Sequence, residues 1–345
     1  MNTVLTRTLG VLSSVCQKSQ QRLSSSFKAA VLIKPGEPLQ IQERKQEKLK
    51  SNQVRVKVSY VSVNSVDCVK FKTGDPNLPF IPGYELAGNV IEVGKEISKE
   101  KVMVGDRVAG LSVENFGAFA EECILDGCDV WRIPSEVDRK DAAVLTYGHS
   151  AALYAFSKLS TLKEKEQIVV TVGPAGMGLA AVDVAANVYG ATVIGVVDNE
   201  ELGDLVREKG AFKTIAFNTK LQKNILKETN NKGVKVVYDA VGEHMMKTVG
   251  TCSALHGKIF HAAPFFYETV PAPTPHSFLS IVSLKYLRKQ NVDLYKTVVA
   301  DTLELANEGI ISAHVSAKFE LEEVNKAIEF IDDKKCTGKV LIHID

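Results

Sequence analysis

The chain has 345 residues, of which 45% are hydrophobic, and its formal net charge at pH 7 is +1. This length and apolar content allow about two domains with sizeable cores and exclude a generally disordered chain. Charged residues make up 24% of the chain without a large basic stripe, so nucleic acid is not an expected partner, and no apolar run approaches the about 20 residues needed for a membrane span.

The N-terminal segment differs in composition from the rest. The first 35 residues contain no Asp or Glu, whereas basic residues, Ser and Thr are frequent. This composition is typical of an amphipathic organelle transit peptide and not of a secretory signal. We therefore expect residues 1–27 to be a mitochondrial presequence cut near residues 23–27, or else the disordered tail of a cytoplasmic protein.

From about residue 28 to residue 134, short strands and turns alternate. Residues 53–64, QVRVKVSYVSVN, alternate polar and apolar side chains with the period of a half-buried strand. GNVIEVG, DRVAGL and AEECIL are similar short runs bounded by Gly, Asp or Pro. This region therefore predicts a compact, mostly antiparallel β unit.

From about residue 147 to residue 265, strands alternate with helices. IVVTV, ATVIGVV, FKTIAF, VKVVYDAVG and GKIFHAA are the expected strands, and segments of helical length separate them. Strands connected in this way indicate βαβ units and a parallel sheet. Two further helices, at residues 301–309 and 321–333, are expected before a last strand, GKVLIHI.

The turn after IVVTV reads TVGPAGMGLA. Gly173, Gly176 and Gly178 permit a tight turn and let backbone N–H groups approach a diphosphate, and the N-terminus of the next helix favours an anion. Ala175 departs from the usual GxGxxG spacing, so the glycines alone fit a plain tight turn equally well. Val197 ends the next strand, and Asp198 follows it 20 residues after Gly178, where an acid binds an adenosine ribose. The order of strand, turn, helix and acid therefore favours a dinucleotide site.

The cysteines are irregularly spaced and form no CxxC pair: Cys16, Cys68, Cys123, Cys128, Cys252 and Cys336. This spacing argues against a disulfide framework and against a closed zinc site. Isolated reduced thiols fit a reducing compartment.

Seven motifs carry a resemblance to a known family. They are VSVNSVD, LPFIPGYELAG, GDRVAG, GAFAE, PAGMGLAAVD, YDAVG and TGKVLI. In this order they resemble the zinc-free quinone oxidoreductase branch of the medium-chain dehydrogenase/reductase superfamily, the relatives of zeta-crystallin. The resemblance implies an α/β fold: a GroES-like mostly-β domain at residues 28–148 and 286–345, with an inserted Rossmann-type, doubly wound parallel-sheet domain at residues 149–285.

The resemblance also implies an activity. Such proteins reduce a quinone or an α,β-unsaturated carbonyl by hydride transfer from NAD(P)H, and they commonly form homodimers through their dinucleotide domains. Residues 265–289 have no obvious place in either domain, and we expect them to shape the substrate cleft or a dimer contact. The alternative is a dinucleotide-binding protein with weak catalysis, redox-sensing or crystallin-like, because the chain departs from the family pattern at Phe71, Leu202, Phe217 and Pro264.

The same resemblance points to Asn64, Asp67 and Tyr84 as catalytic residues. Asn64 and Tyr84 stand where zinc-dependent relatives carry Cys and His, and neither an amide nor a neutral phenol is a usual zinc ligand. We therefore expect no metal. Asn64 could instead form a local turn, Asp67 could only cap the next helix, and Tyr84 either donates a hydrogen bond or fills the space that zinc occupies elsewhere.

Twelve residues are expected to bind the cofactor: Ser150, Gly173, Ala175, Gly176, Met177, Gly178, Asp198, Asn199, Val241, Gly242, His261 and Ala262. Family enzymes usually bind the 2′-phosphate of NADPH through polar residues at places that here hold Asn199, Leu202 and Phe217. The Asp198 carboxylate disfavours a phosphate and favours a ribose diol. We therefore expect NADH to be favoured over NADPH, unless Asp198 only caps the following helix.

Overall fold

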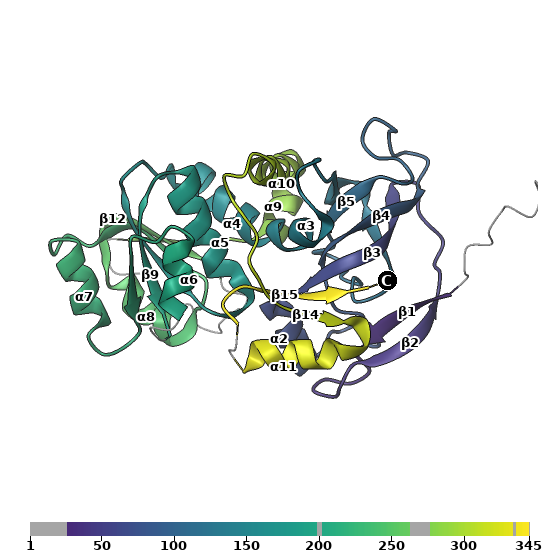
Figure 1. Cartoon of the computed structure of the whole chain (residues 1–345), viewed down its shortest axis with the longest axis horizontal. Helices are drawn as coiled ribbons and strands as arrows, with labels where there is room; N and C mark the ends of the chain where they lie inside the picture. The colour runs from purple at the N-terminus through teal and green to yellow at the C-terminus, as the bar shows by residue number, and fades with distance from the viewer. Residues whose placement is uncertain (1–25, 199–201, 263–276, 334–335, 345) are drawn as a thin grey trace, which may run out of the picture.

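The computed structural model describes residues 26–198, 202–262, 277–333 and 336–344. Two large sheets, of six and seven strands, form the centres of two domains that lie side by side in Figure 1. The predicted presequence falls almost entirely outside the described residues and stays a prediction.

The six-stranded sheet is parallel throughout. Its order is β10-β9-β8-β11-β12-β13, so the direction of winding reverses between β8 and β11. Ligands of doubly wound sheets bind beyond the carboxyl ends of the strands at such a reversal. The strands are β8 (Gln167–Val172), β9 (Thr192–Val197), β10 (Lys213–Ala216), β11 (Val234–Asp239), β12 (Ser253–His261) and β13 (Phe278–Ile281).

Helices connect the strands from β8 to β12, and β8 and β9 are almost completely buried, as expected of a parallel sheet with both faces covered. The last of these helices ends at Gly250, and β12 begins at Ser253, four residues before the strand expected at GKIFHAA. The helices are α5 (Met177–Asp183), α6 (Gly203–Glu208), α7 (Leu221–Glu228) and α8 (Glu243–Gly250).

The seven-stranded sheet belongs to the β domain. Its order is β14-β15-β3-β4-β5-β7, and β6 pairs with β3. The strands are β3 (Gln53–Val63), β4 (Glu85–Val93), β5 (Arg107–Leu111), β6 (Glu122–Asp126), β7 (Val130–Arg132), β14 (Val315–Glu320) and β15 (Lys339–His343), and β1 (Ser26–Val31) and β2 (Gln40–Lys45) form a separate two-stranded sheet.

The C-terminal strand β15 runs antiparallel beside β3, and Figure 1 shows the yellow end of the chain next to this early strand. Early and late segments therefore build one domain, and the parallel sheet is inserted between them. This arrangement confirms the predicted fold class, while the exact domain boundaries stay predictions.

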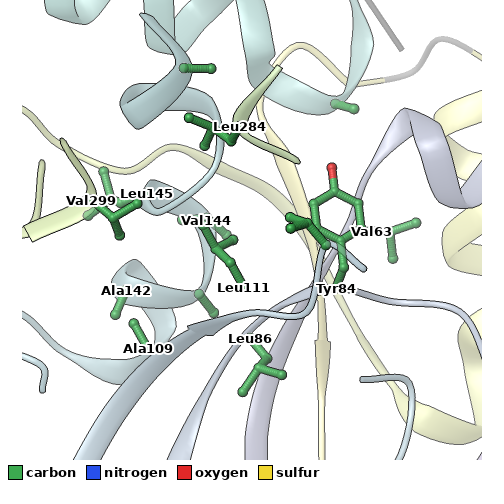
Figure 2. Packing of buried hydrophobic residues seen from close by; sticks show 14 of the residues in the cluster. Val63, Tyr84, Leu86, Ala109, Leu111, Ala142, Val144, Leu145, Leu284 and Val299 are labelled. Atoms are coloured by element: carbon green, nitrogen blue, oxygen red, sulfur yellow. The ribbon is translucent and has the colours of Figure 1, made fainter. Parts of the chain in front are cut away.

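In the described part of the chain, further α-helices border the β domain or join it to the parallel sheet: α2 (Ser65–Thr73), α3 (Arg139–Leu145), α4 (Gly148–Tyr154), α9 (Leu284–Gln290), α10 (Val292–Asn307) and α11 (Val324–Asp332). The α10 helix begins at Val292, well before the helix expected from residue 301, because Tyr295, Val298 and Val299 already form its buried face. Figure 2 shows Leu86 and Leu111 of the β domain in one apolar cluster with Leu145 of α3. The same cluster contains Val170 of β8, so the two domains share a packed core.

Candidate functional site

A cavity of about 410 Å³ lies between the two domains, a volume within the usual range of small-molecule sites. One wall comes from the β domain and includes Asn64 and Tyr84. The opposite wall comes from the carboxyl edge of the parallel sheet and includes Ala175, Met177 and His261. The cavity therefore lies where the strand order predicts a ligand.

The turn between β8 and α5 is closely packed. A Cβ at Gly178 would lie 2.3 Å from the carbonyl oxygen of Thr171, and one at Gly173 would lie 2.8 Å from Val241. Gly176 has a φ of 76° and Ala175 a φ of 64°, so the turn runs through the left-handed region. These glycines let the turn pack closely against its neighbours. Because a helix starts here and its first backbone N–H groups lack partners within the helix, the turn fits a nucleotide diphosphate.

Asp239, at the end of β11, contacts residues near the ends of the neighbouring strands β8 and β12. Its Oδ1 accepts a hydrogen bond from Thr171 Oγ1 (2.8 Å) and from the N–H of Gly242 (2.9 Å), and its Oδ2 lies 2.8 Å from His261 Nδ1. Val241 lies against Gly173, and His261 and Ala262 line the cavity. Five predicted cofactor-binding residues therefore lie together: Gly173, Val241, Gly242, His261 and Ala262.

Three predicted cofactor-binding residues remain: Asp198, Asn199 and Ser150. Asp198 follows β9 directly and does not line the cavity, and Asn199 lies outside the described residues. Ser150 is completely buried, and its hydroxyl donates a hydrogen bond to Thr302 Oγ1 at 2.9 Å. In this structure the Ser150 hydroxyl therefore links α4 to α10 and does not reach the cavity.

Asn64 belongs to a buried polar network. Its Nδ2 donates to Ser62 Oγ (2.8 Å) and to Glu85 Oε2 (3.2 Å), and its Oδ1 accepts from Lys339 Nζ (2.6 Å). These bonds fix the orientation of the amide. Asn64 lines the cavity, yet its amide is already bonded within the protein, so it forms a rigid part of the wall.

Glu85 is the centre of this network. Its carboxylate also accepts from the backbone N–H of Tyr147 (2.7 Å) and from Thr146 Oγ1 (3.2 Å). Burial alone would raise the pKa of Glu85, but the charge and hydrogen bond of Lys339, together with the neutral donors, lower it. The carboxylate is therefore ionised and fully paired inside the protein.

Asp67 is completely buried behind the residues that line the cavity. Its two oxygens accept from the backbone N–H groups of Asn64 and Gly83, each at 2.9 Å. Burial raises the pKa of Asp67 to about 7, although these two donors act in the opposite direction. Asp67 is not a cavity-lining residue; it supports the segments that carry Asn64 and Tyr84.

Tyr84 lines the cavity between two aromatic rings. The ring centroids of Phe116 and Tyr147 lie 5.4 and 5.0 Å from its own, both nearly edge-on. Figure 2 shows its hydroxyl directed away from Leu86. Burial raises the pKa of Tyr84 well above its ordinary value, so the phenol stays protonated and can donate a hydrogen bond.

Sequence reasoning missed three members of this site: Glu85, Tyr147 and Lys339. Glu85 and Lys339 lie inside the quoted motifs PGYELAG and TGKVLI, so the motifs contained the signal. No motif contained Tyr147. Only the fold brings Lys339 of the last strand against Asn64 and Glu85.

Two general findings bear on the class of protein. Among the described residues, no group of three or more His, Cys, Asp or Glu side chains is placed to hold a metal ion. None of the helices in the described ranges is long and apolar enough to span a bilayer.

Comparison with known families gives two matches. Residues 50–135 match the alcohol dehydrogenase GroES-like domain, and residues 176–306 match the family described as zinc-binding dehydrogenase. Among solved structures, the quinone oxidoreductase of Pseudomonas syringae is 23% identical with a TM-score of 0.84, over 92% of this chain and 99% of that one. The quinone oxidoreductase of Escherichia coli, complexed with NADPH, is 21% identical with a TM-score of 0.83, over the same shares.

Curated relatives are more similar in sequence. The quinone oxidoreductase-like protein 2 homolog of Nematostella vectensis is 34% identical over 92% of this chain and 89% of its own length. Quinone oxidoreductase-like protein 2 of Rattus norvegicus is 33% identical over 96% of both chains. Together with the fold, these relatives show that the chain belongs to the quinone oxidoreductase branch of the medium-chain dehydrogenase/reductase superfamily.

Proposed function

We propose that the chain is a zinc-independent NAD(P)H-dependent oxidoreductase that reduces a quinone or an α,β-unsaturated carbonyl. One observation carries this proposal: the Tyr84 phenol lines the same cavity as the turn that follows β8. The names of the relatives, and the NADPH bound to the Escherichia coli enzyme, support it.

The residues have distinct roles in this proposal. The backbone from Gly173 to Gly178 and the start of α5 would hold the diphosphate, and His261 and Ala262 would line the place of the nicotinamide. When bound, the reduced nicotinamide would supply a hydride. The protonated Tyr84 would donate a hydrogen bond to the negative charge that develops on the acceptor oxygen, and a proton from water would complete the reduction.

The Asn64 network supports zinc independence. The Lys339 ammonium lies 2.6 Å from Asn64 Oδ1 and 2.8 Å from Glu85 Oε2. A second cation at this place would be repelled by the ammonium and would find the carboxylate already neutralised. Activity that survives dialysis against a strong chelator, with no zinc detected by elemental analysis, is the expected result.

The edge of the parallel sheet supports a homodimer. Among the described strands β13 is the last of this sheet; it carries the exposed side chains of Phe278 and Ile281, and Tyr286 follows on α9. Exposed apolar side chains at the end of a sheet favour pairing with a second chain. Analytical ultracentrifugation should give the mass of two chains, and Phe278→Lys should give monomers.

The composition of residues 1–35 supports a mitochondrial location. Fractionation of cells that express the full chain should recover it in mitochondria. N-terminal sequencing of the recovered protein should start near residues 23–27. A protein that stays in the cytoplasm with its N-terminus intact would contradict this assignment.

The activity is tested with purified protein and a panel of quinones and enones. Oxidation of NADH and NADPH is followed by absorbance, and transfer of deuterium from C4 of the labelled nicotinamide is followed by mass spectrometry. We expect turnover of both classes, with the label retained on the β-carbon of reduced enones and lost to water from the hydroxyl groups of hydroquinones. Saturable nucleotide binding with no reduction across the panel would support the catalytically weak, dinucleotide-binding alternative.

A further inference from the structure

Two lysines line the cavity beside α2 and α9. Lys70 lies on α2 and Lys285 on α9, and the cavity wall contains both. Among the described residues that line the cavity, no Asp or Glu is present. The charged side chains that face an occupant are therefore cationic.

Among the described residues, these lysines belong to a cluster in which lysines outnumber carboxylates. Lys70 forms an ion pair with Asp75, and Glu114 lies 3.4 Å from Lys285 and 3.5 Å from Lys289. Burial tends to raise the pKa of Asp75, but the hydrogen bond and charge of Lys70 and the charge of Lys285 lower it. Lys70 and Lys285 therefore both lower the pKa of Asp75. The cluster contains three lysines, Lys70, Lys285 and Lys289, and two carboxylates, Asp75 and Glu114.

The Lys70 ammonium is held at the wall by aromatic rings. Its Nζ lies 5.0 Å from the centroid of Phe80 and 4.8 Å from that of Phe116, distances at which a cation is attracted to the ring face. Phe116 also packs against Tyr84. The held ammonium therefore lies next to the aromatic group that contains the proposed hydrogen-bond donor.

We infer that Lys70 and Lys285 form an anion subsite, and that the preferred acceptor is a quinone or enone bearing a carboxylate, sulfonate or similar anionic group. This inference rests on the proposed function for its reaction and on the charge distribution for its specificity. The turn that follows β8 contributes Ala175 and Met177 to the cavity, and the lysines come from α2 and α9. The acceptor therefore places its anion at the lysines and its reducible ring or double bond toward the nicotinamide.

The kinetic test compares 1,2-naphthoquinone with 1,2-naphthoquinone-6-sulfonate, whose sulfonate lies on the non-quinone ring and is not displaced by amines, at saturating NADH. We expect the sulfonate to have a KM about tenfold lower, equivalent to about 1.4 kcal/mol, and the difference to shrink with added salt. Lys285→Gln and Lys70→Gln should each remove most of the difference. Lys289→Gln is the matched control because Lys289 pairs with the same Glu114 without lining the cavity, and it should keep the difference.

A binding test examines the anion subsite independently of the proposed reduction of quinones and enones. Calorimetry with saturating NAD⁺ compares naphthalene-2-sulfonate with the neutral naphthalene-2-sulfonamide. Tighter binding of the sulfonate that Lys285→Gln abolishes supports the anion subsite, even if neither quinone is reduced, in which case the proposed function alone fails. Turnover of both quinones with equal KM, together with equal binding of the two probes, overturns the anion subsite and leaves the proposed function standing.

Discussion

The ammonium of Lys339 lies 2.8 Å from the carboxylate of Glu85, and both side chains are buried. The pair joins β15, at the end of the chain, to β4 in the β domain. Removing one partner of a buried ion pair leaves an uncompensated charge and costs about 3–5 kcal/mol, whereas removing both often costs little.

We therefore expect Lys339→Met and Glu85→Gln each to lower the free energy of unfolding by about 3 kcal/mol. The double variant should lose less unfolding free energy than the sum of the two single losses, because neither partner remains as an unpaired buried charge. Urea denaturation of the four proteins measures the coupling. Strict additivity would contradict a direct pair, and the exposed Lys140→Met is a suitable control because its contact with Asp141 is long.

Asp67 gives the second prediction, which concerns pH. Its pKa rises from an ordinary value near 3.9 to about 7 in the folded protein. The folded state therefore binds this proton more tightly than the unfolded chain. The resulting stability is fully present below about pH 4 and is lost as pH rises through about 7.

The change that isolates this effect is Asp67→Asn, which stays neutral throughout. The advantage of the wild type over this variant in unfolding free energy should fall by about 2 kcal/mol between pH 5 and pH 8. Urea denaturation at several pH values measures it. Asp204→Asn, at an exposed ion pair, should leave the pH dependence unchanged, and parallel curves for wild type and Asp67→Asn would refute the assignment.

The third prediction tests the turn that follows β8. In Gly178→Ala, the new methyl group would lie 2.3 Å from the Thr171 carbonyl oxygen, so α5 must move away from β8. We expect nucleotide affinity to fall more than tenfold and unfolding free energy to drop by about 1–3 kcal/mol. Fluorescence titration with NADPH measures the first effect.

The matched control is Gly250→Ala. Its methyl group would make only an ordinary 3.7 Å contact with Ile259, at the end of α8. This variant should bind NADPH like the wild type. Equal affinity in Gly178→Ala would show that the turn does not hold the nucleotide.

Tyr84 carries the fourth prediction. Tyr84→Phe keeps the ring that packs against Phe116 and Tyr147 and removes only the hydroxyl. Loss of a donor to a developing oxyanion typically costs about 100-fold or more in rate, so kcat should fall by about this factor while KM changes little. Initial-rate kinetics measure both constants.

The control is Tyr147→Phe. Tyr147 lines the same cavity, and burial raises its pKa to about 12, so it is also a protonated phenol. Our assignment gives it no bond to the acceptor, and we expect less than a threefold change in kcat. A larger loss in this variant than in Tyr84→Phe would move the donor role to Tyr147.

The fold could be predicted from the sequence because it depends on local patterns. The turn around Gly176, the alternating strands and the βαβ spacing each depend on neighbouring residues, and the structure confirms the two kinds of sheet. The site was only partly predictable because its network joins distant segments. Asn64 and Lys339 are 275 residues apart yet share a hydrogen bond, and no local pattern reports such a contact.

The cofactor preference gives the last prediction. Asp198 follows the second strand of the dinucleotide domain, and Leu202 packs against the core at the start of the next helix. A carboxylate near the adenosine ribose accepts hydrogen bonds from a diol and repels a 2′-phosphate. We expect kcat/KM for NADH to exceed that for NADPH, and Asp198→Ser combined with Leu202→Lys to reverse the order by removing the repulsion and adding a cation.

Initial rates at equal cofactor concentrations measure this preference. Asp204→Ser, at an exposed position on α6, is the control for a general charge effect. A clear NADPH preference in the wild type would mean that the Asp198 carboxylate does not face the ribose.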